Sequence, residues 1–285
     1  MYSQEITRCH RAAIVIAIDQ SSSMSGRMEL NGESLSKADV VSMVMGRLVD
    51  ELIMRSYGGS GYRYYYDVAI LGYSNGEVYS LLGDRDCFYP ITTLAAKKIE
   101  HTSYILPYNT LNSGVNSFYE SVSRWVEPRA QGDTPMYKMI NRVTAMVGEW
   151  CANEENRDSF PPIVFNITDG EASDADFEML QGAAARLKSI STTDGETLFV
   201  NVHISSSKLQ SPIIFPTAAE LPPTLRNAQL LMEMSSVVPA PFNQYVGACR
   251  AKRGEPPYIA MSYNASISEL IAMLNIGSRS SRVGI

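Results

Sequence analysis

The sequence predicts an α/β protein with a doubly wound, mostly parallel central sheet, helices on both faces and one antiparallel edge strand. Three largely apolar runs, at residues 12–19, 163–168 and 197–204, have the length and composition of strands that are buried on both faces. Amphipathic segments with helix-capping residues separate these runs. Such an alternation of strands and helices is typical of a parallel sheet that is covered on both sides.

The first strand is expected at residues 12–19, and a helix should follow it. Ser36 and Asp39 have the spacing of a capping box, in which each side chain binds the backbone of the other residue. Apolar residues then recur at helical spacing, and Gly58 and Gly59 are expected to end the helix. The apolar positions are Val41, Val44, Met45, Leu48 and Leu52.

A hairpin is predicted next, from residues 67–73 and 77–82 joined at Asn75-Gly76, because Asn-Gly is a strong signal for a tight hairpin turn. Its second strand would supply the antiparallel edge of the sheet. Residues 84–131 show no clean periodicity beyond a short helical signal at 94–99. This segment is interpreted as an irregular insertion.

Thr134 is predicted to cap the next helix, with Pro135 at the first helical position, where a missing N–H costs nothing. The strand at 163–168 follows, and Ser173 and Asp176 are expected to cap a helix that runs to about residue 190. The strand at 197–204 then completes the core of the sheet.

The C-terminal part begins with a proline-rich segment, residues 205–257, which contains a helix at 224–235. A final strand and helix are predicted over 258–277, with Ser266 and Glu269 as the capping pair. The chain is interpreted as a single domain, residues 1–285, with its core at 12–204. A small appended subdomain over 205–257 remains an alternative.

Composition excludes several functions. A net charge of −6 and the lack of a long run of Lys and Arg argue against a nucleic-acid partner. Four widely spaced cysteines suggest neither a zinc site nor a disulfide framework. No stretch of about 18 apolar residues occurs, and residues 1–11 do not resemble a signal peptide. A cytoplasmic protein without a membrane partner is therefore expected.

Oxygen-bearing side chains gather where the predicted strands end. Asp19, Ser21 and Ser23 follow the first strand, Thr134 lies in the loop before a helix, and Asp169 follows the strand at 163–168. In open α/β sheets, ligands bind beyond the carboxyl ends of the strands. Hard divalent cations prefer oxygen ligands, so these positions are candidates for a metal site.

These three segments resemble the von Willebrand factor A (VWA) family. Its metal-ion-dependent adhesion site (MIDAS) consists of Asp-x-Ser-x-Ser, a Gly-x-Thr loop and a strand that ends in Thr-Asp-Gly. All three parts are present here in order. The resemblance covers about residues 12–204 and implies a Rossmann-like fold with Asp19, Ser21, Ser23, Thr134 and Asp169 at the metal.

The resemblance also implies a function, namely a protein-interaction module that binds a Glu or Asp side chain of a partner protein through the ion. Mg²⁺ is the expected cofactor, although Mn²⁺ and Ca²⁺ accept the same oxygen ligands. Among intracellular relatives, the chain looks similar to compact bacterial proteins associated with tellurite resistance and stress operons, which are thought to act beside kinases and phosphatases.

The alternative is a Mg²⁺-dependent phosphohydrolase of the haloacid dehalogenase type, which also places an Asp after its first strand. In those enzymes a second Asp, two positions later, serves as general acid, and here that position is Ser21. A serine hydrolase is less well supported still, because the sequence has no Gly-x-Ser-x-Gly elbow and no suitably placed His. No catalytic residue is assigned, and the protein is expected not to be an enzyme.

Overall fold

The fold is built around one eight-stranded sheet. The computed structural model describes residues 2–30, 33–83, 87–97, 104–108, 118–204, 212–250 and 254–264. The strand order is β13-β14-β12-β9-β1-β4-β5, with β6 also paired to β4. The strands are β1 (Ala12–Asp19), β4 (Tyr66–Ser74), β5 (Glu77–Ser80), β6 (Tyr89–Pro90), β9 (Phe160–Thr168), β12 (Leu198–His203), β13 (Ile213–Ile214) and β14 (Met261–Tyr263).

Parallel pairs join the five strands from β14 to β4, so the predicted parallel core is confirmed. The predicted antiparallel edge strand is β5, which joins β4 through a turn at Asn75 and Gly76, both with positive φ. Two further short strands, β6 and β13, also pair antiparallel, so the opposite edge of the sheet is antiparallel too.

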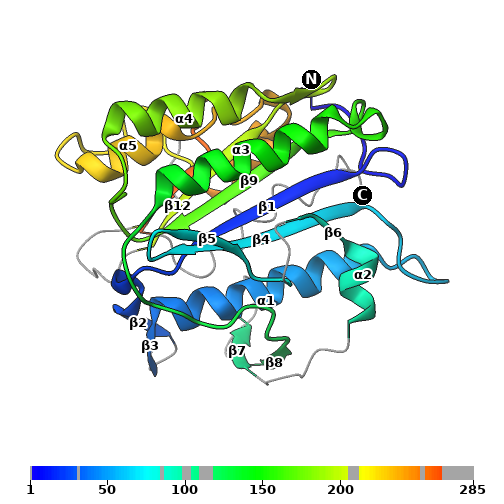
Figure 1. Cartoon of the computed structure of the whole chain (residues 1–285), viewed down its shortest axis with the longest axis horizontal. Coiled ribbons are helices and arrows are strands. Elements are labelled where there is room, and N and C mark those ends of the chain that lie inside the picture. Colours follow the sequence, from blue (N-terminus) through cyan, green and yellow to red (C-terminus); the bar gives the residue numbers. More distant parts are fainter. Residues whose placement is uncertain are drawn as a thin grey trace.

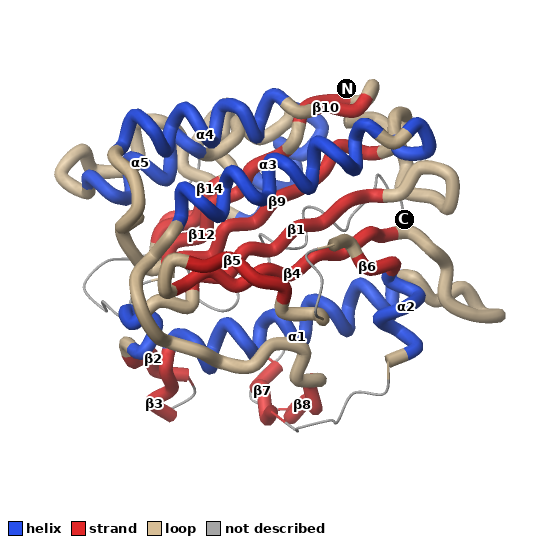
Figure 2. Tube along the Cα trace, viewed as in Figure 1, coloured by secondary structure: helices blue, strands red, loops and turns tan. Residues whose placement is uncertain are grey.

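Helices cover both faces of the sheet (Figures 1 and 2). Helices α3, α4 and α5 lie over one face, and α1 lies under the other. The helices are α1 (Lys37–Arg55), α2 (Ile91–Ala96), α3 (Met136–Ala152), α4 (Phe177–Ser189), α5 (Arg226–Met234) and α6 (Asn243–Cys249). None of those in the described parts of the chain combines the length and apolar character needed to cross a bilayer.

Two separate apolar cores follow from this layering. Successive side chains of a strand point to opposite faces of the sheet. Ile14, Ile16 and Ile18 of β1 accordingly pack into the core under α1, whereas Val15 and Ala17 pack into the core beneath α3 and α4. All eight residues of β1 are buried, which explains why this strand appears in the sequence as a nearly continuous apolar run.

Several predicted helix boundaries are confirmed and one is wrong. The capping box of α1 is present, since Ser36 Oγ accepts from the Asp39 N–H at 3.0 Å and Asp39 Oδ2 accepts from the Ser36 N–H at 3.2 Å. Helix α4 begins after Asp176, which caps it. Thr134 does not cap α3, which begins at Met136; Pro135 occupies the capping position and its side chain accepts no hydrogen bond.

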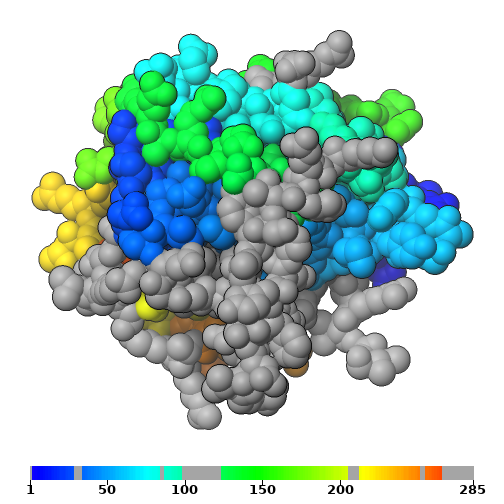
Figure 3. Space-filling model, turned by 90° about the horizontal axis from the view of Figure 1, so that it is seen from below, coloured from blue at the N-terminus to red at the C-terminus, as the bar shows by residue number. Residues whose placement is uncertain are grey.

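The segment between β5 and α3 contains more regular structure than its sequence indicates. It includes β6, α2 and a hairpin of β7 (Tyr104–Tyr108) and β8 (Phe118–Val122). Its last part packs on α1 (Figure 3), where Trp125 Nε1 and the Ser123 N–H both donate to the Asp50 carboxylate at 3.0 Å. Ser42 also donates to the Val126 carbonyl.

The described residues also contain small elements outside the main sheet. Two strand pairs are β2 (Arg27–Leu30) with β3 (Glu33–Ser36) and β10 (Ser191–Thr192) with β11 (Gly195–Glu196). Short 3-10 turns occur at Ser22–Ser25, Glu154–Asn156 and Ala240–Phe242. In the proline-rich segment, α5 packs beside β12 and α4. The final helix predicted at 266–277 lies outside the described residues.

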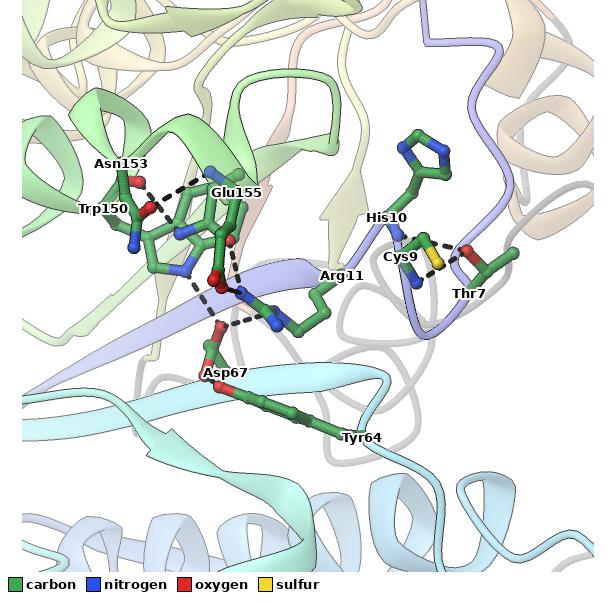
Figure 4. Close-up of polar contacts among 10 residues, drawn as sticks. Thr7, Cys9, His10, Arg11, Tyr64, Asp67, Trp150, Asn153 and Glu155 are labelled. Carbon is green, nitrogen blue, oxygen red and sulfur yellow. Dashed lines mark hydrogen bonds and ion pairs between the residues drawn. The ribbon is translucent and has the colours of Figure 1, made fainter.

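A polar cluster holds the amino-terminal ends of the strands together (Figure 4). The buried Asp67 carboxylate accepts from Tyr64 Oη at 2.5 Å and from Trp150 Nε1 at 3.0 Å, and it lies 3.5 Å from Arg11 Nε. The Arg11 guanidinium also lies 4.6 Å from the centre of the Tyr64 ring. The cluster ties β1, β4 and α3 together at the end of the sheet where the strands begin.

Asp67→Ala should lower the free energy of unfolding by about 3 kcal/mol, because it takes a buried counter-charge from Arg11 and the acceptor from the buried Trp150 Nε1 and the half-buried Tyr64 hydroxyl. Urea denaturation followed by tryptophan fluorescence measures this change. Glu155→Ala is the matched control, since Glu155 also pairs with Arg11 but its side chain is 75% exposed. An exposed pair contributes less than about 1 kcal/mol. Equal losses in the two variants would contradict this account of the cluster.

Candidate functional site

The candidate site lies at the carboxyl ends of β1 and β9, at the end of the sheet opposite the Asp67 cluster (Figure 1). These two strands are parallel neighbours in the middle of the sheet, with Ile18 opposite Ile167. Asp19 is the last residue of β1, and Asp169 directly follows β9. Parallel pairing therefore places the two carboxylates at the same edge of the sheet.

The Asp19 carboxylate is fully buried. Its Oδ1 accepts from the Ser21 N–H at 2.9 Å, and its Oδ2 accepts from Thr168 Oγ1 at 2.8 Å. Burial raises the pKa of Asp19 to about 6; the hydrogen bonds from Ser21 and Thr168 oppose this rise, and the charge of Asp169 adds to it. No ion pair involves Asp19 among the described residues.

Two serine hydroxyls connect the surface loop to the second carboxylate. Ser21 Oγ lies 3.0 Å from Ser23 Oγ, and Ser23 Oγ donates to Asp169 Oδ1 at 2.6 Å. Ser21 is buried and Ser23 is exposed, so the row of oxygens runs from the end of β1 to the surface. Four of the five predicted site residues are thus brought together by direct contacts.

Thr134 lies in a loop that runs beside the Asp19 loop. The Ser22 N–H donates to the Gly132 carbonyl at 2.9 Å, and the Gln131 N–H donates to the Gln20 carbonyl at 2.8 Å. Thr134 itself is 7% exposed. In the described structure, no hydrogen bond joins its hydroxyl to the other four predicted residues. The loops are adjacent, but Thr134 stands outside the connected row.

Ser173 fixes the backbone of Thr134. Ser173 Oγ accepts from the Thr134 N–H at 3.0 Å, and the Thr134 carbonyl accepts from the Ser173 N–H at 3.0 Å. The first turn of α3 is capped by another residue of the same loop, since the Asp174 carboxylate accepts from the N–H groups of Tyr137 at 3.0 Å and Lys138 at 2.9 Å. This explains why α3 needs no cap from Thr134.

Three other polar residues near the site have partners elsewhere. Asp133 Oδ1 accepts from the Gly76 N–H at 2.7 Å, so this carboxylate stabilises the hairpin turn. The exposed Glu171 accepts from Asn227 of α5. Ser25 Oγ donates to the Ser22 carbonyl at 2.7 Å and closes the 3-10 turn. Each of these contacts supports a loop.

The structure adds two residues that the sequence did not indicate. Thr168 donates to Asp19, as described above, and Lys37 Nζ donates to Asp169 Oδ2 at 2.6 Å. The Thr-Asp-Gly pattern contains Thr168, but nothing in the pattern says that its hydroxyl points to Asp19. The sequence gives one weak indication for Lys37. A cation in the first turn of a helix is disfavoured by the helix dipole, so a lysine at that position suggests a compensating negative partner.

His203 lies beside the site but does not resemble a catalytic base. Its ring stacks on Tyr263, with 4.7 Å between centroids and 14° between planes. Burial lowers the pKa of His203 to about 4; the charge of Asp169 opposes this and that of Lys37 adds to it. The imidazole is therefore neutral at pH 7.

The donor atoms fit a hard divalent cation. Carboxylate and hydroxyl oxygens are the ligands that Mg²⁺, Mn²⁺ and Ca²⁺ accept, and the buried Asp19 carboxylate has no ion-pair partner in the described structure. The described residues contain no group of three or more His, Cys, Asp or Glu side chains able to hold an ion, so a site here would use serine hydroxyls together with the two carboxylates. The row of oxygens is thus a candidate site for a hard cation.

Known structures resemble this fold. A von Willebrand factor type A protein from Catenulispora acidiphila matches at 12% identity and a TM-score of 0.42, over 69% of this chain and 34% of its own. Proximal thread matrix protein 1 from the mussel byssus matches at 14% identity and a TM-score of 0.48. The match covers 94% of this chain and 47% of the mussel protein. A structure of the same mussel protein with a zinc-occupied MIDAS motif matches at 16% identity and a TM-score of 0.35. This match covers 70% of this chain and 37% of the mussel protein.

This chain therefore spans less than half of each of these structures. No family model matches the sequence, and no curated protein matches it either. Likeness at these identities concerns the fold only. The functional interpretation therefore depends on the residues of this chain and their geometry.

Gly132→Ala should lower the free energy of unfolding by about 2–4 kcal/mol, because φ is +80° and a Cβ would lie 2.7–2.9 Å from atoms of Asn75. Gly76→Ala is the control, since its φ is +71° but a Cβ there meets nothing within 4 Å, and a cost of about 1 kcal/mol is expected. Urea denaturation measures both values. A Gly132 variant no less stable than the Gly76 variant would show that the loop is not tightly packed.

Proposed function

We propose that this chain is a metal-dependent protein-interaction module. The observation that carries the proposal is the row of oxygens from the buried Asp19 carboxylate through Ser21 and Ser23 to Asp169. The row begins at a carboxylate that has no ion-pair partner among the described residues, and it reaches the surface at the exposed Ser23. Such an arrangement suits an ion that is held by the protein on one side and open to an outside ligand on the other.

Asp19, Ser21 and Ser23 would hold the ion, with Thr134 and Asp169 as the other two positions that the VWA resemblance implies. Mg²⁺ is the preferred ion, since it takes oxygen ligands and commonly keeps some of its waters. When bound, the ion would supply a coordination position for an outside oxygen. The residues of this chain fix the loops around that position through Thr168, Ser173 and Gly132.

A partner carboxylate is the ligand that suits this position, because it is a hard anionic oxygen donor. The surface beside the site supports a protein partner. Phe177 and Met179, in the first turn of α4, are 47% and 45% exposed. Phe177 also lines a small hollow with Gly170, the residue after Asp169. A Glu or Asp side chain with apolar neighbours could therefore contact both the ion and this apolar rim.

Binding is favoured over catalysis by the residue two positions after Asp19. A haloacid dehalogenase-type phosphohydrolase needs an acid there to protonate the leaving group. Here Ser21 occupies that position, and its hydroxyl lies against Ser23. A serine hydroxyl does not serve as a general acid at neutral pH without an activating partner.

Asp19→Ala and Thr134→Ala should each abolish Mg²⁺-dependent retention of a partner protein in a pull-down that compares Mg²⁺ with EDTA. Asp19→Ala should also weaken Mg²⁺ binding by roughly 100-fold in isothermal titration calorimetry, because a carboxylate ligand is lost. Ser22→Ala is the control, since Ser22 is exposed in the same loop and is not among the predicted ligands.

Two results would contradict the proposal. The first is a partner retained equally in EDTA. The second is hydrolysis of p-nitrophenyl phosphate that disappears in Asp19→Asn, which would identify a phosphohydrolase instead.

A further inference from the structure

Lys37 carries a buried positive charge at the candidate metal site. Its Nζ lies 2.6 Å from Asp169 Oδ2, and the two side chains are only 9% and 1% exposed. Asp169 therefore has two partners, Lys37 on Oδ2 and Ser23 on Oδ1. Lys37 is the first residue of α1, where the helix dipole disfavours a cation. The ion pair with Asp169, and not the position in the helix, therefore accounts for a lysine at this site.

Gly26 leaves room for this lysine. A Cβ at Gly26 would lie 3.2 Å from Lys37 Cε and 3.3 Å from Lys37 Nζ, which is tighter than an ordinary contact. The Lys37 N–H also donates to the Gly26 carbonyl at 2.8 Å. The lysine is thus held at its backbone by Gly26 and at its ammonium by Asp169, and it has little freedom to move away.

We infer that Lys37 sets the charge of the metal site by neutralising Asp169. The inference rests on the proposed metal-binding function. A doubly charged ion beside Asp19 and Asp169 alone would be fully neutralised. With Lys37 present, one positive charge remains, and a partner carboxylate is attracted to it. Lys37 thereby weakens the hold of this chain on the ion and strengthens its hold on an anionic ligand.

The same ion pair also stabilises the site without metal. A carboxylate that is 1% exposed would be costly to bury without a counter-charge, and Lys37 supplies that charge whether or not an ion is bound. The site should therefore keep its shape in EDTA, and metal should add less to the stability of the wild type than to that of a variant without the ammonium.

Lys37→Met tests the inference with metal alone. In EDTA the melting temperature should fall by roughly 5 °C or more, because the buried Asp169 loses its counter-charge and keeps only the hydrogen bond from Ser23. Isothermal titration with MgCl₂ should give a dissociation constant that is roughly ten-fold lower than that of the wild type, since one repelling charge is gone. Added Mg²⁺ should accordingly raise the melting temperature more in Lys37→Met than in the wild type.

Two controls accompany this variant. Lys37→Arg keeps the charge and should bind Mg²⁺ within about three-fold of the wild type. Lys138→Met removes a lysine whose side chain is 53% exposed and paired with Glu77, and it should leave Mg²⁺ binding unchanged. Lys37→Gln, which keeps a hydrogen-bond donor without the charge, replaces Lys37→Met if that variant does not fold.

The outcomes separate the two proposals. If the wild type binds Mg²⁺ and the uncharged Lys37 variant binds it equally or more weakly, the inference about Lys37 is wrong while the metal site stands. If no form of the protein binds Mg²⁺ or Mn²⁺, the proposed function is wrong and the inference falls with it. Tighter binding by Lys37→Met, with Lys37→Arg and Lys138→Met unchanged, supports both.

Discussion

The buried carboxylate of Asp19 is the constraint around which the site is organised. A carboxylate at the end of a central strand must find donors or a counter-charge, because burying it without them costs several kcal/mol. The chain provides donors from two directions, the Ser21 N–H of its own loop and the Thr168 hydroxyl of the neighbouring strand. These bonds fix the loop after β1 against β9, and the two serines then extend the polar row to Asp169.

Much of the fold could be predicted from the sequence because its strongest signals are local. The apolar run of β1, the Asn75-Gly76 turn and the capping box at Ser36 each act over a few residues, and the structure contains all three. The sequence wrongly predicts Thr134 as a helix cap, because N–H groups in the first turn of α3 donate to Asp174, which is distant in the sequence. A local pattern cannot reveal a partner that lies 37 residues away.

The site was predictable in part for the same reason. Motif spacing placed Asp19, Ser21, Ser23 and Asp169 at strand ends, and parallel pairing of β1 with β9 explains why they meet. Lys37 was not predictable, because its contact with Asp169 spans 132 residues and depends on the absence of a side chain at Gly26. The charge of the site is therefore a property of the tertiary structure that no single motif contains.

Helix α1 connects this site to the segment that precedes α3. Lys37 is its first residue, and Asp50, about 20 Å further along the axis, receives the donors of Ser123 and Trp125. Both ends of the helix are therefore bound to segments that lie outside it, the loop after β9 through Asp169 and the segment before α3 through Trp125. One helix thus packs the candidate metal site and the end of the long segment between β5 and α3 into the same layer.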